Sequence, residues 1–237
     1  VAFIAKLGRD MFGDKALEGL KADRIDTTGV SRDPEEPSGV AEIFVSDSGE
    51  NSIAVASGAN ARLQLRDIEK AEASLESADI LVMQLEIPLQ TVQAAAEIAR
   101  KYKLTTILNP APAQPLSDEL LNNVDIITPN ESETRLLTGI EVQDDNSAQK
   151  AADILHAKGI GTVIITLGKK GVYISGQNTG EHIPGFSVKA VDTTAAGDVF
   201  NGALAVALAE KQSLTYAITF ANAAAALSVT RLGAQPS

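Results

Sequence analysis

Residues 80–108, ILVMQLEIPLQTVQAAAEIARKYKLTTIL, determine the fold class that this sequence predicts. Apolar runs of strand length open and close the segment, at residues 80–84 and 105–108. Between them, apolar residues recur at helical spacing over residues 89–102. A strand, a helix and a second strand in this order indicate a unit in which the two strands run parallel.

The same alternation continues through the rest of the chain. Strand-like segments occupy residues 1–7, 126–128 and 162–167, a β-rich stretch covers 172–191, and helical patterns cover 10–21, 116–122, 131–137, 148–155, 197–210 and 214–228. Repeated strand–helix units predict a three-layer α/β/α fold built on a mainly parallel sheet. Because ligands of such sheets bind at the carboxyl ends of the strands, the loops at those ends are the first candidates for a site.

One segment departs from this pattern. Two β-prone runs, residues 40–45 and 52–55, flank the turn-rich sequence SDSGEN at 46–51, which predicts a hairpin. Its alternation is half polar, so we expect it to lie outside the main core as a small β lid over about residues 38–57. We expect all 237 residues to form one domain that carries this lid.

Composition excludes several classes of partner. The net charge is −11, so neither nucleic acid nor an anionic membrane surface is expected to bind. No apolar run reaches about 18 residues, and the opening VAFIAKLG lacks the basic region of a signal peptide. There is no Cys, which suits a cytoplasmic protein, and the two histidines form no pattern typical of a zinc site.

Residues 192–203, DTTAAGDVFNGA, carry the strongest chemical signal. Small residues at Ala195, Ala196 and Gly197 follow a strand and open a helix, where unpaired N–H groups attract anions. This arrangement predicts a phosphate pocket. Asp198 beside it is either a base that accepts a proton from an attacking hydroxyl or an acidic residue that favours the first helical turn.

Other polar residues at the strand ends are ambiguous on their own. The sequence Asn130-Glu131-Ser132-Glu133 is typical of a helix cap with acidic residues in its first turn. Residues 166–171, TLGKKG, read as a glycine turn, and their spacing is not that of a Walker A loop. Glu86 reads as a loop carboxylate and Asn222 as an exposed residue of a helix.

Several of these segments share a resemblance. Residues 192–205 resemble the signature of the carbohydrate kinase family that includes ribokinase, fructokinase and adenosine kinase. Five further segments resemble the ribokinases of that family more narrowly, and they are residues 83–86, 109–113, 124–131, 165–171 and 229–237. The resemblance extends over nearly the whole chain and implies a ribokinase-like fold.

The resemblance also implies roles for individual residues. Asp198 is implied as the catalytic base, and Glu86 as an acidic residue that contacts the sugar. The anion hole comprises Ala195, Ala196 and Gly197, with the Asp198 backbone beside them. The residues implied to bind ATP are Asn130, Thr166, Leu167, Gly168, Lys169, Lys170, Gly171, Gly197, Asp198 and Asn222.

Two metal ions are implied as cofactors beside ATP. Glu133 would act on Mg²⁺ through water, as this ion keeps several waters in proteins. The residues implied to hold K⁺, several of them through backbone carbonyls, are Asp192, Thr194, Ser228, Arg231, Gly233 and Ser237.

The implied activity is the ATP-dependent phosphorylation of D-ribose at its primary hydroxyl to give ribose 5-phosphate. The implied assembly is a homodimer formed through the lid. Family members also carry an amino-terminal stretch with N-x-D and G-G-K-x-x-N sugar contacts and a final helix, and neither is found here. We therefore expect this chain to be incomplete at both ends, and the alternatives are another sugar or nucleoside kinase or a non-catalytic nucleotide-binding module.

Overall fold

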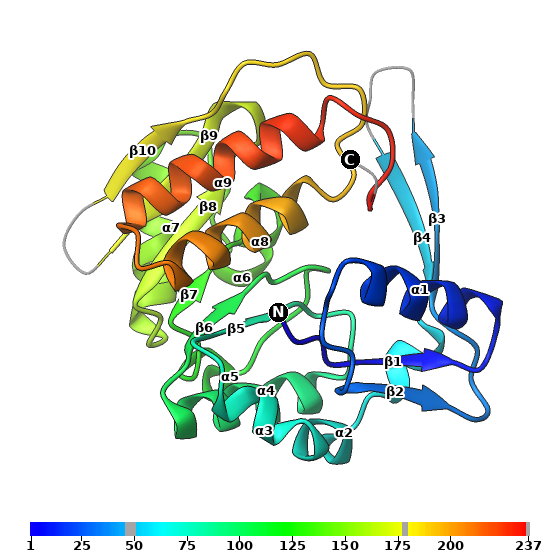
Figure 1. Cartoon of the computed structure of the whole chain (residues 1–237). Coiled ribbons are helices and arrows are strands. Elements are labelled where there is room, and N and C mark those ends of the chain that lie inside the picture. Colours follow the sequence, from blue (N-terminus) through cyan, green and yellow to red (C-terminus); the bar gives the residue numbers. More distant parts are fainter. Residues whose placement is uncertain (46–50, 177–179, 236–237) are drawn as a thin grey trace.

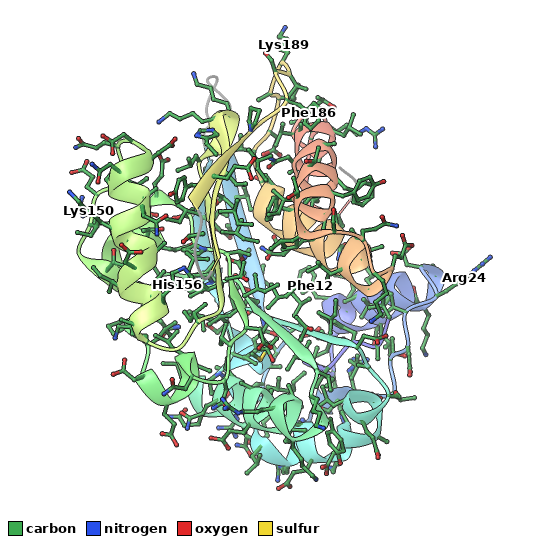
Figure 2. The ribbon with its side chains drawn as sticks, turned by 90° about the vertical axis from the view of Figure 1, so that its left-hand side faces the viewer. Phe12, Arg24, Lys150, His156, Phe186 and Lys189 are labelled. Carbon is green, nitrogen blue, oxygen red and sulfur yellow. The ribbon has the colours of Figure 1, made fainter. Side chains whose placement is uncertain are left out.

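The computed structural model describes residues 1–45, 51–176 and 180–235, which form an α/β structure in three layers (Figures 1 and 2). Its central sheet has six strands in the order β10-β9-β8-β7-β6-β5. The strands are β5 (Ile80–Met83), β6 (Thr105–Leu108), β7 (Ile126–Ile127), β8 (Thr162–Thr166), β9 (Gly171–Ser175) and β10 (Gly180–Pro184). Strands β5 to β8 are parallel and β9 and β10 are antiparallel, which confirms the predicted mainly parallel sheet.

Apolar side chains alternate between the two faces of this sheet. Ile107 and Ile126 face one core and their neighbours Leu108 and Ile127 face the other. Helices α8 (Ala196–Ala209) and α9 (Leu214–Ser228) cover the first face. The second face is covered by α4 (Leu89–Tyr102), α5 (Asp118–Leu121), α6 (Glu131–Thr138) and α7 (Asp145–Ala157), with the short α2 (Leu65–Lys70) and α3 (Glu72–Glu76) at its margin. Figure 2 shows α7, marked by Lys150 and His156, across the sheet from α8 and α9.

A second, two-stranded parallel sheet lies beside the central one. It pairs β1 (Ala5–Gly8) with β2 (Val30–Asp33), and α1 (Met11–Ala22) connects them (Figure 1). The strand predicted at residues 1–7 is therefore shorter and displaced, and β2 was not predicted. Only one residue of β2, Val30, is apolar, so the segment lacks the hydrophobic pattern of a strand.

The predicted hairpin is confirmed by the antiparallel pair β3 (Val40–Val45) and β4 (Asn51–Ala56), which η1 (Gly58–Arg62) follows. Figure 1 shows the pair projecting from the rest of the chain. The hairpin's turn, residues 46–50, lies outside the described residues. None of the described helices is both long and apolar enough to cross a bilayer.

The start of α7 corrects one prediction. The helical pattern predicts a helix over residues 148–155, but α7 begins earlier, at Asp145. Asp144 and Ser147 form a capping box, in which the Asp144 carboxylate accepts a hydrogen bond from the Ser147 N–H at 2.8 Å. The acidic Asp144 therefore serves the helix end.

Candidate active site

The carboxyl ends of the parallel strands and the amino end of α8 meet at one edge of the central sheet. The loops after β7 and β8 are joined there, because the Thr166 N–H donates to the Pro129 carbonyl at 2.8 Å. A β-bridge between Asn130 and Thr166 extends this contact. The topology thus brings together residues that lie far apart in the sequence, as the rule for open α/β sheets requires.

Helix α8 begins at an unusual backbone position. Its N-cap residue, Ala195, is left-handed at φ 59° and ψ 11°, and no side chain caps the helix. A left-handed alanine costs about 1–2 kcal/mol, and strain of this kind is concentrated at functional sites. A Cβ added at Gly197 would meet nothing within 4 Å, so the space before the first turn is open. The Ala195–Gly197 turn is therefore the candidate anion site that the residue types predict, with the Ala196 N–H donating to the Thr193 carbonyl at 3.3 Å.

Asp198 lies in the first turn of α8 and is exposed to solvent. Even so, burial by the surrounding protein raises the pKa of its carboxyl group above the usual 3.8. This position suits a base that must meet a substrate.

Glu86 follows β5 and faces the same region. Partial burial raises the pKa of its carboxyl group, and the negative charge of Asp198 raises it further. The two carboxylates are thus close enough to repel each other, although 112 positions separate them in the sequence (198 − 86). Neither group has a hydrogen-bonded cation among the described residues, so both can accept hydrogen bonds from a ligand.

Asn201 fixes the geometry of this region, and the sequence did not point to it. Its side-chain Nδ2 donates to the carbonyl of Gly197 at 2.8 Å, and its Oδ1 accepts a hydrogen bond from the Thr128 hydroxyl at 2.8 Å. Both side chains are buried. Thr128 directly follows β7, so these bonds tie the first turn of α8 to the end of a central strand. An amide on the buried face of an apolar helix is the one sequence signal that could have suggested this role.

Asn130 and Glu133 form the cap that their residue types predict. Asn130 is the N-cap of α6 and accepts a hydrogen bond from the Glu133 N–H at 2.8 Å, while Glu133 accepts one from the Asn130 N–H at 2.8 Å. Glu133 is buried, and burial raises the pKa of its carboxyl group while the Asn130 N–H partly opposes that effect. The Glu133 carboxylate is consequently fixed beside the β7–α6 loop.

The segment after β8 is a tight turn held by glycine. The 3₁₀ turn η2 (Gly168–Lys170) is closed by a hydrogen bond from the Leu167 N–H to the Gly171 carbonyl at 2.8 Å. Gly171 has φ +98°, and a Cβ there would lie 2.2 Å from the Ile183 carbonyl oxygen. Only glycine fits this position, which brings the turn against the β10 strand. Lys169 and Lys170 are exposed on it.

Asn222 is buried in α9, which excludes the alternative interpretation of Asn222 as an exposed helical residue. Its Nδ2 is buried and has no hydrogen-bond partner among the described residues. A buried amide donor without a partner costs about 1–3 kcal/mol, so such groups usually await a ligand or water.

Asp192 joins the two segments predicted to hold a monovalent cation. Its buried carboxylate accepts hydrogen bonds from the Thr194 N–H and the Gly233 N–H, each at 2.9 Å. The Thr194 contacts lower the pKa of Asp192 most, followed by the Gly233 N–H. Ser228 is buried at the end of α9, and Arg231 is exposed beyond it. Ser237 lies outside the described residues.

Comparison with known proteins shows the family of this chain. The profile of the pfkB family carbohydrate kinases matches residues 1–237. A ribokinase of Haemophilus influenzae is 52% identical over 100% of this chain and 78% of its own length, and a deoxyribokinase of Salmonella typhi is 38% identical over the same shares. A structure of Arabidopsis thaliana ribokinase complexed with ribose and ATP superposes with a TM-score of 0.90 at 32% identity, covering 99% of this chain and 77% of that one.

The chain therefore belongs to the pfkB family of carbohydrate kinases. It is a sugar kinase with the ribokinase fold, as the resemblance in residues 192–205 predicts.

Proposed function

We propose that this protein transfers the γ-phosphoryl group of ATP to the primary hydroxyl of D-ribose, giving ribose 5-phosphate, with Asp198 as the catalytic base. The observation that carries the proposal is the Asp198 carboxylate, which is accessible at the open amino end of α8 and has a raised pKa. A raised pKa makes a carboxylate a better proton acceptor. The name of the 52% identical relative supports ribose as the sugar.

The proposed reaction is an in-line displacement. Asp198 accepts the proton of the primary hydroxyl, the resulting oxygen bonds to the γ-phosphorus, and the bond from that phosphorus to the β–γ bridging oxygen breaks to release ADP. The N–H groups of the Ala195–Gly197 turn stabilise the charge on the transferred group. Glu86 accepts hydrogen bonds from sugar hydroxyls, which rejects sugars that lack them.

We assign the nucleotide to the loops that follow β7 and β8 and to the neighbouring α9. Asn130, the six residues from Thr166 to Gly171, and Asn222 would surround it. The unpartnered Nδ2 of Asn222 supports this assignment, because a base with acceptor atoms satisfies a buried donor. The open space before Gly197 leaves room for the phosphates.

Two cations fit the residues present. Among the described residues, no cluster of three or more His, Cys, Asp or Glu side chains could hold a metal alone. Mg²⁺ does not need such a cluster, because phosphates and waters supply most of its ligands, and Glu133 would act on the ion through those waters. Mg²⁺ would neutralise charge on the transferred phosphate. K⁺ would lie between the segments that Asp192 joins, with Thr194, Ser228, Arg231, Gly233 and Ser237 contributing.

We also propose that the β3–β4 hairpin closes over the sugar and pairs with the hairpin of a second copy in a cytoplasmic homodimer. Along one face of the hairpin, Ala41 lies opposite Val55 and Ile43 opposite Ile53, so these two successive pairs are apolar. An isolated two-stranded sheet is marginally stable, and pairing would bury that face. Ile43→Asp should give monomers in sedimentation analysis, whereas Glu42→Gln on the opposite face should not; dimers of Ile43→Asp would contradict the assembly.

A coupled assay of ADP formation tests the function. We expect ADP formation to depend on ribose and on K⁺, with phosphate attached to the primary hydroxyl of the product by NMR. The 38% identical deoxyribokinase makes 2-deoxyribose the competing sugar, and a higher kcat/KM for it would replace ribose in the proposal. ATP binding in calorimetry without any sugar binding or turnover would contradict both.

A further inference from the structure

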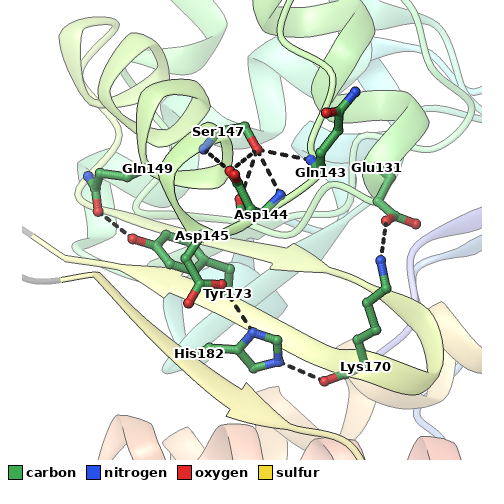
Figure 3. Close-up of polar contacts among 9 residues, drawn as sticks. All are labelled: Glu131, Gln143, Asp144, Asp145, Ser147, Gln149, Lys170, Tyr173 and His182. Atoms are coloured by element: carbon green, nitrogen blue, oxygen red, sulfur yellow. Dashed lines mark hydrogen bonds and ion pairs between the residues drawn. The ribbon is translucent and has the colours of Figure 1, made fainter.

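Both ring nitrogens of His182, on β10, lie within hydrogen-bond distance of an oxygen acceptor. Its Nε2 lies 2.8 Å from the carbonyl oxygen of Lys170, and its Nδ1 lies 3.2 Å from Oδ1 of Asp145 (Figure 3). A carbonyl and a carboxylate can only accept hydrogen bonds. Both contacts are therefore hydrogen bonds only when both ring nitrogens carry a proton, which makes the ring an imidazolium.

The other histidine provides an internal contrast. Nδ1 of His156 lies 2.7 Å from the Ile160 carbonyl, and its Nε2 lies 2.9 Å from the hydroxyl of Ser175. Because a hydroxyl can donate a hydrogen bond, the neutral ring satisfies both of these contacts. The two histidines thus differ in their partners, since Ser175 can donate whereas both partners of His182 can only accept.

Several charged or titratable groups surround His182. Asp145 approaches from the first turn of α7, Lys170 from η2 and Tyr173 from the opposite position on β9. The bond to the Lys170 carbonyl raises the pKa of His182 most, and Asp145 raises it further, while burial and the Lys170 charge oppose them. The change of charge of the ring is thus displaced above the usual histidine pKa of 6.5.

The carbonyl that His182 contacts belongs to the end of the η2 turn. The Lys170 carbonyl also accepts a hydrogen bond from the Gly185 N–H at 3.2 Å, and the Lys170 ammonium lies 3.7 Å from Glu131 in the first turn of α6 (Figure 3). The backbone carbonyl of Lys170 is consequently held from the β10 side, and its ammonium group is held by α6. Movement of His182 would remove one of the two hydrogen bonds that hold the Lys170 carbonyl.

We propose that His182 is a positioning residue for the nucleotide: as an imidazolium it holds the Lys170 carbonyl and so keeps the Gly168–Lys170 turn in the conformation that receives ATP. This inference rests on the proposed role of that turn in ATP binding. When the ring loses one proton, a nitrogen lone pair faces either the Lys170 carbonyl or the Asp145 carboxylate, whichever tautomer forms. In the tautomer protonated on Nδ1 the Lys170 contact becomes repulsive, and the turn loosens. In the tautomer protonated on Nε2 the Asp145 contact becomes repulsive, and the ring that holds the turn loses its attachment to α7.

The effect should appear in the KM for ATP rather than in kcat. His182 and Asp145 are 32% and 63% exposed, so we expect KM to rise only about threefold as pH increases through the pKa of His182. The measurement is KM for ATP from about pH 5.5 to 8.5, a range that brackets an ordinary histidine, at saturating ribose in the full-length protein. His182→Gln should abolish the pH dependence, and Asp145→Asn should move the transition to lower pH. His156→Gln is the matched control and should retain the wild-type profile.

A second readout is independent of turnover. Because binding and protonation are linked reciprocally, MgADP should raise the pKa of the His182 ring measured by NMR. An unchanged KM profile in His182→Gln, together with a His182 pKa unaffected by MgADP, would overturn the inference. A wild-type protein without ribose-dependent ADP formation would instead contradict the proposed function, and the NMR titration would still decide the role of His182.

Discussion

The hydroxyl of Thr128 donates to the side-chain oxygen of Asn201 across 2.8 Å, although the two residues are 73 positions apart in the sequence. The bond connects the end of β7 to α8, and Asn201 continues the connection to the Gly197 carbonyl. These two hydrogen bonds thus attach the Ala195–Gly197 turn to the central sheet. A rigid support of this kind is what a site that acts by positioning requires.

Asn201→Ala should therefore lower turnover although Asn201 touches no ligand in our proposal. The substitution removes both bonds and leaves the first turn of α8 less fixed, so we expect kcat to fall about tenfold or more. Thr128→Val, which leaves only the Asn201 oxygen unsatisfied, should cost about 1–3 kcal/mol in the free energy of unfolding by urea, with a smaller loss of kcat. Wild-type kcat in Asn201→Ala would remove this anchor from the account.

Two glycines of the η2 turn offer a matched comparison. Gly171→Ala places a methyl group 2.2 Å from the Ile183 carbonyl oxygen at φ +98°, so the turn must move away from β10. Gly168→Ala at φ +56° meets nothing within 4 Å and should cost only the left-handed penalty of about 1–2 kcal/mol. We expect the KM for ATP to rise clearly more in Gly171→Ala. Equal values for the two variants would show that the turn does not bind ATP.

Asp192 should link stability to pH and activity to K⁺. Because folding lowers its pKa, its contribution to stability is present above the unfolded value of about 3.9 and is lost as pH falls through the folded value. Asp192→Asn should raise the K⁺ concentration needed for half-maximal activity. Asp26→Asn, which removes the charge from a carboxylate that accepts a similar hydrogen bond from the Thr28 N–H, is the control and should leave K⁺ activation unchanged. The same response in both variants would exclude Asp192 from the cation site.

The raised pKa of Asp198 predicts the acidic limb of the pH profile. A base acts only when it has lost its proton, so kcat/KM for ribose should rise with pH around a value above 3.8. The charge of Asp198 also raises the pKa of Glu86, and Asp198→Asn should lower that pKa in a ¹³C NMR titration. An unchanged Glu86 pKa would mean that the two carboxylates do not share a site.

The sequence predicted the parts of the fold that have a strong hydrophobic pattern. Helix α4 is observed over Leu89–Tyr102, the residues its spacing predicts, because one face must meet the sheet. Strand β2 was missed, since Ser31, Arg32 and Asp33 give no apolar alternation and only pairing with β1 makes them a strand. The hydrophobic pattern of residues 30–33 does not show that they pair with β1.

The same limit applies to the site. The Asp198 segment was found because its chemistry lies within a few consecutive residues. Asn201 and His182 were not assigned roles, because their partners Thr128 and Asp145 are far away in the sequence and meet them only through the sheet. Asn222 was read as exposed, since helix α9 is apolar on nearly all sides and its sequence does not reveal which face is buried.

The most direct test of the account is the turnover of Asp198→Asn measured beside its thermal stability. Asparagine keeps the shape of the side chain but cannot accept the hydroxyl proton, so kcat should fall at least about 10²-fold while ATP binding is retained. Because folding raises the pKa of Asp198, the ionised carboxylate opposes folding at neutral pH, and the variant should melt no lower than the wild type. Near-normal turnover in a folded Asp198→Asn protein would contradict the role of Asp198 as the base.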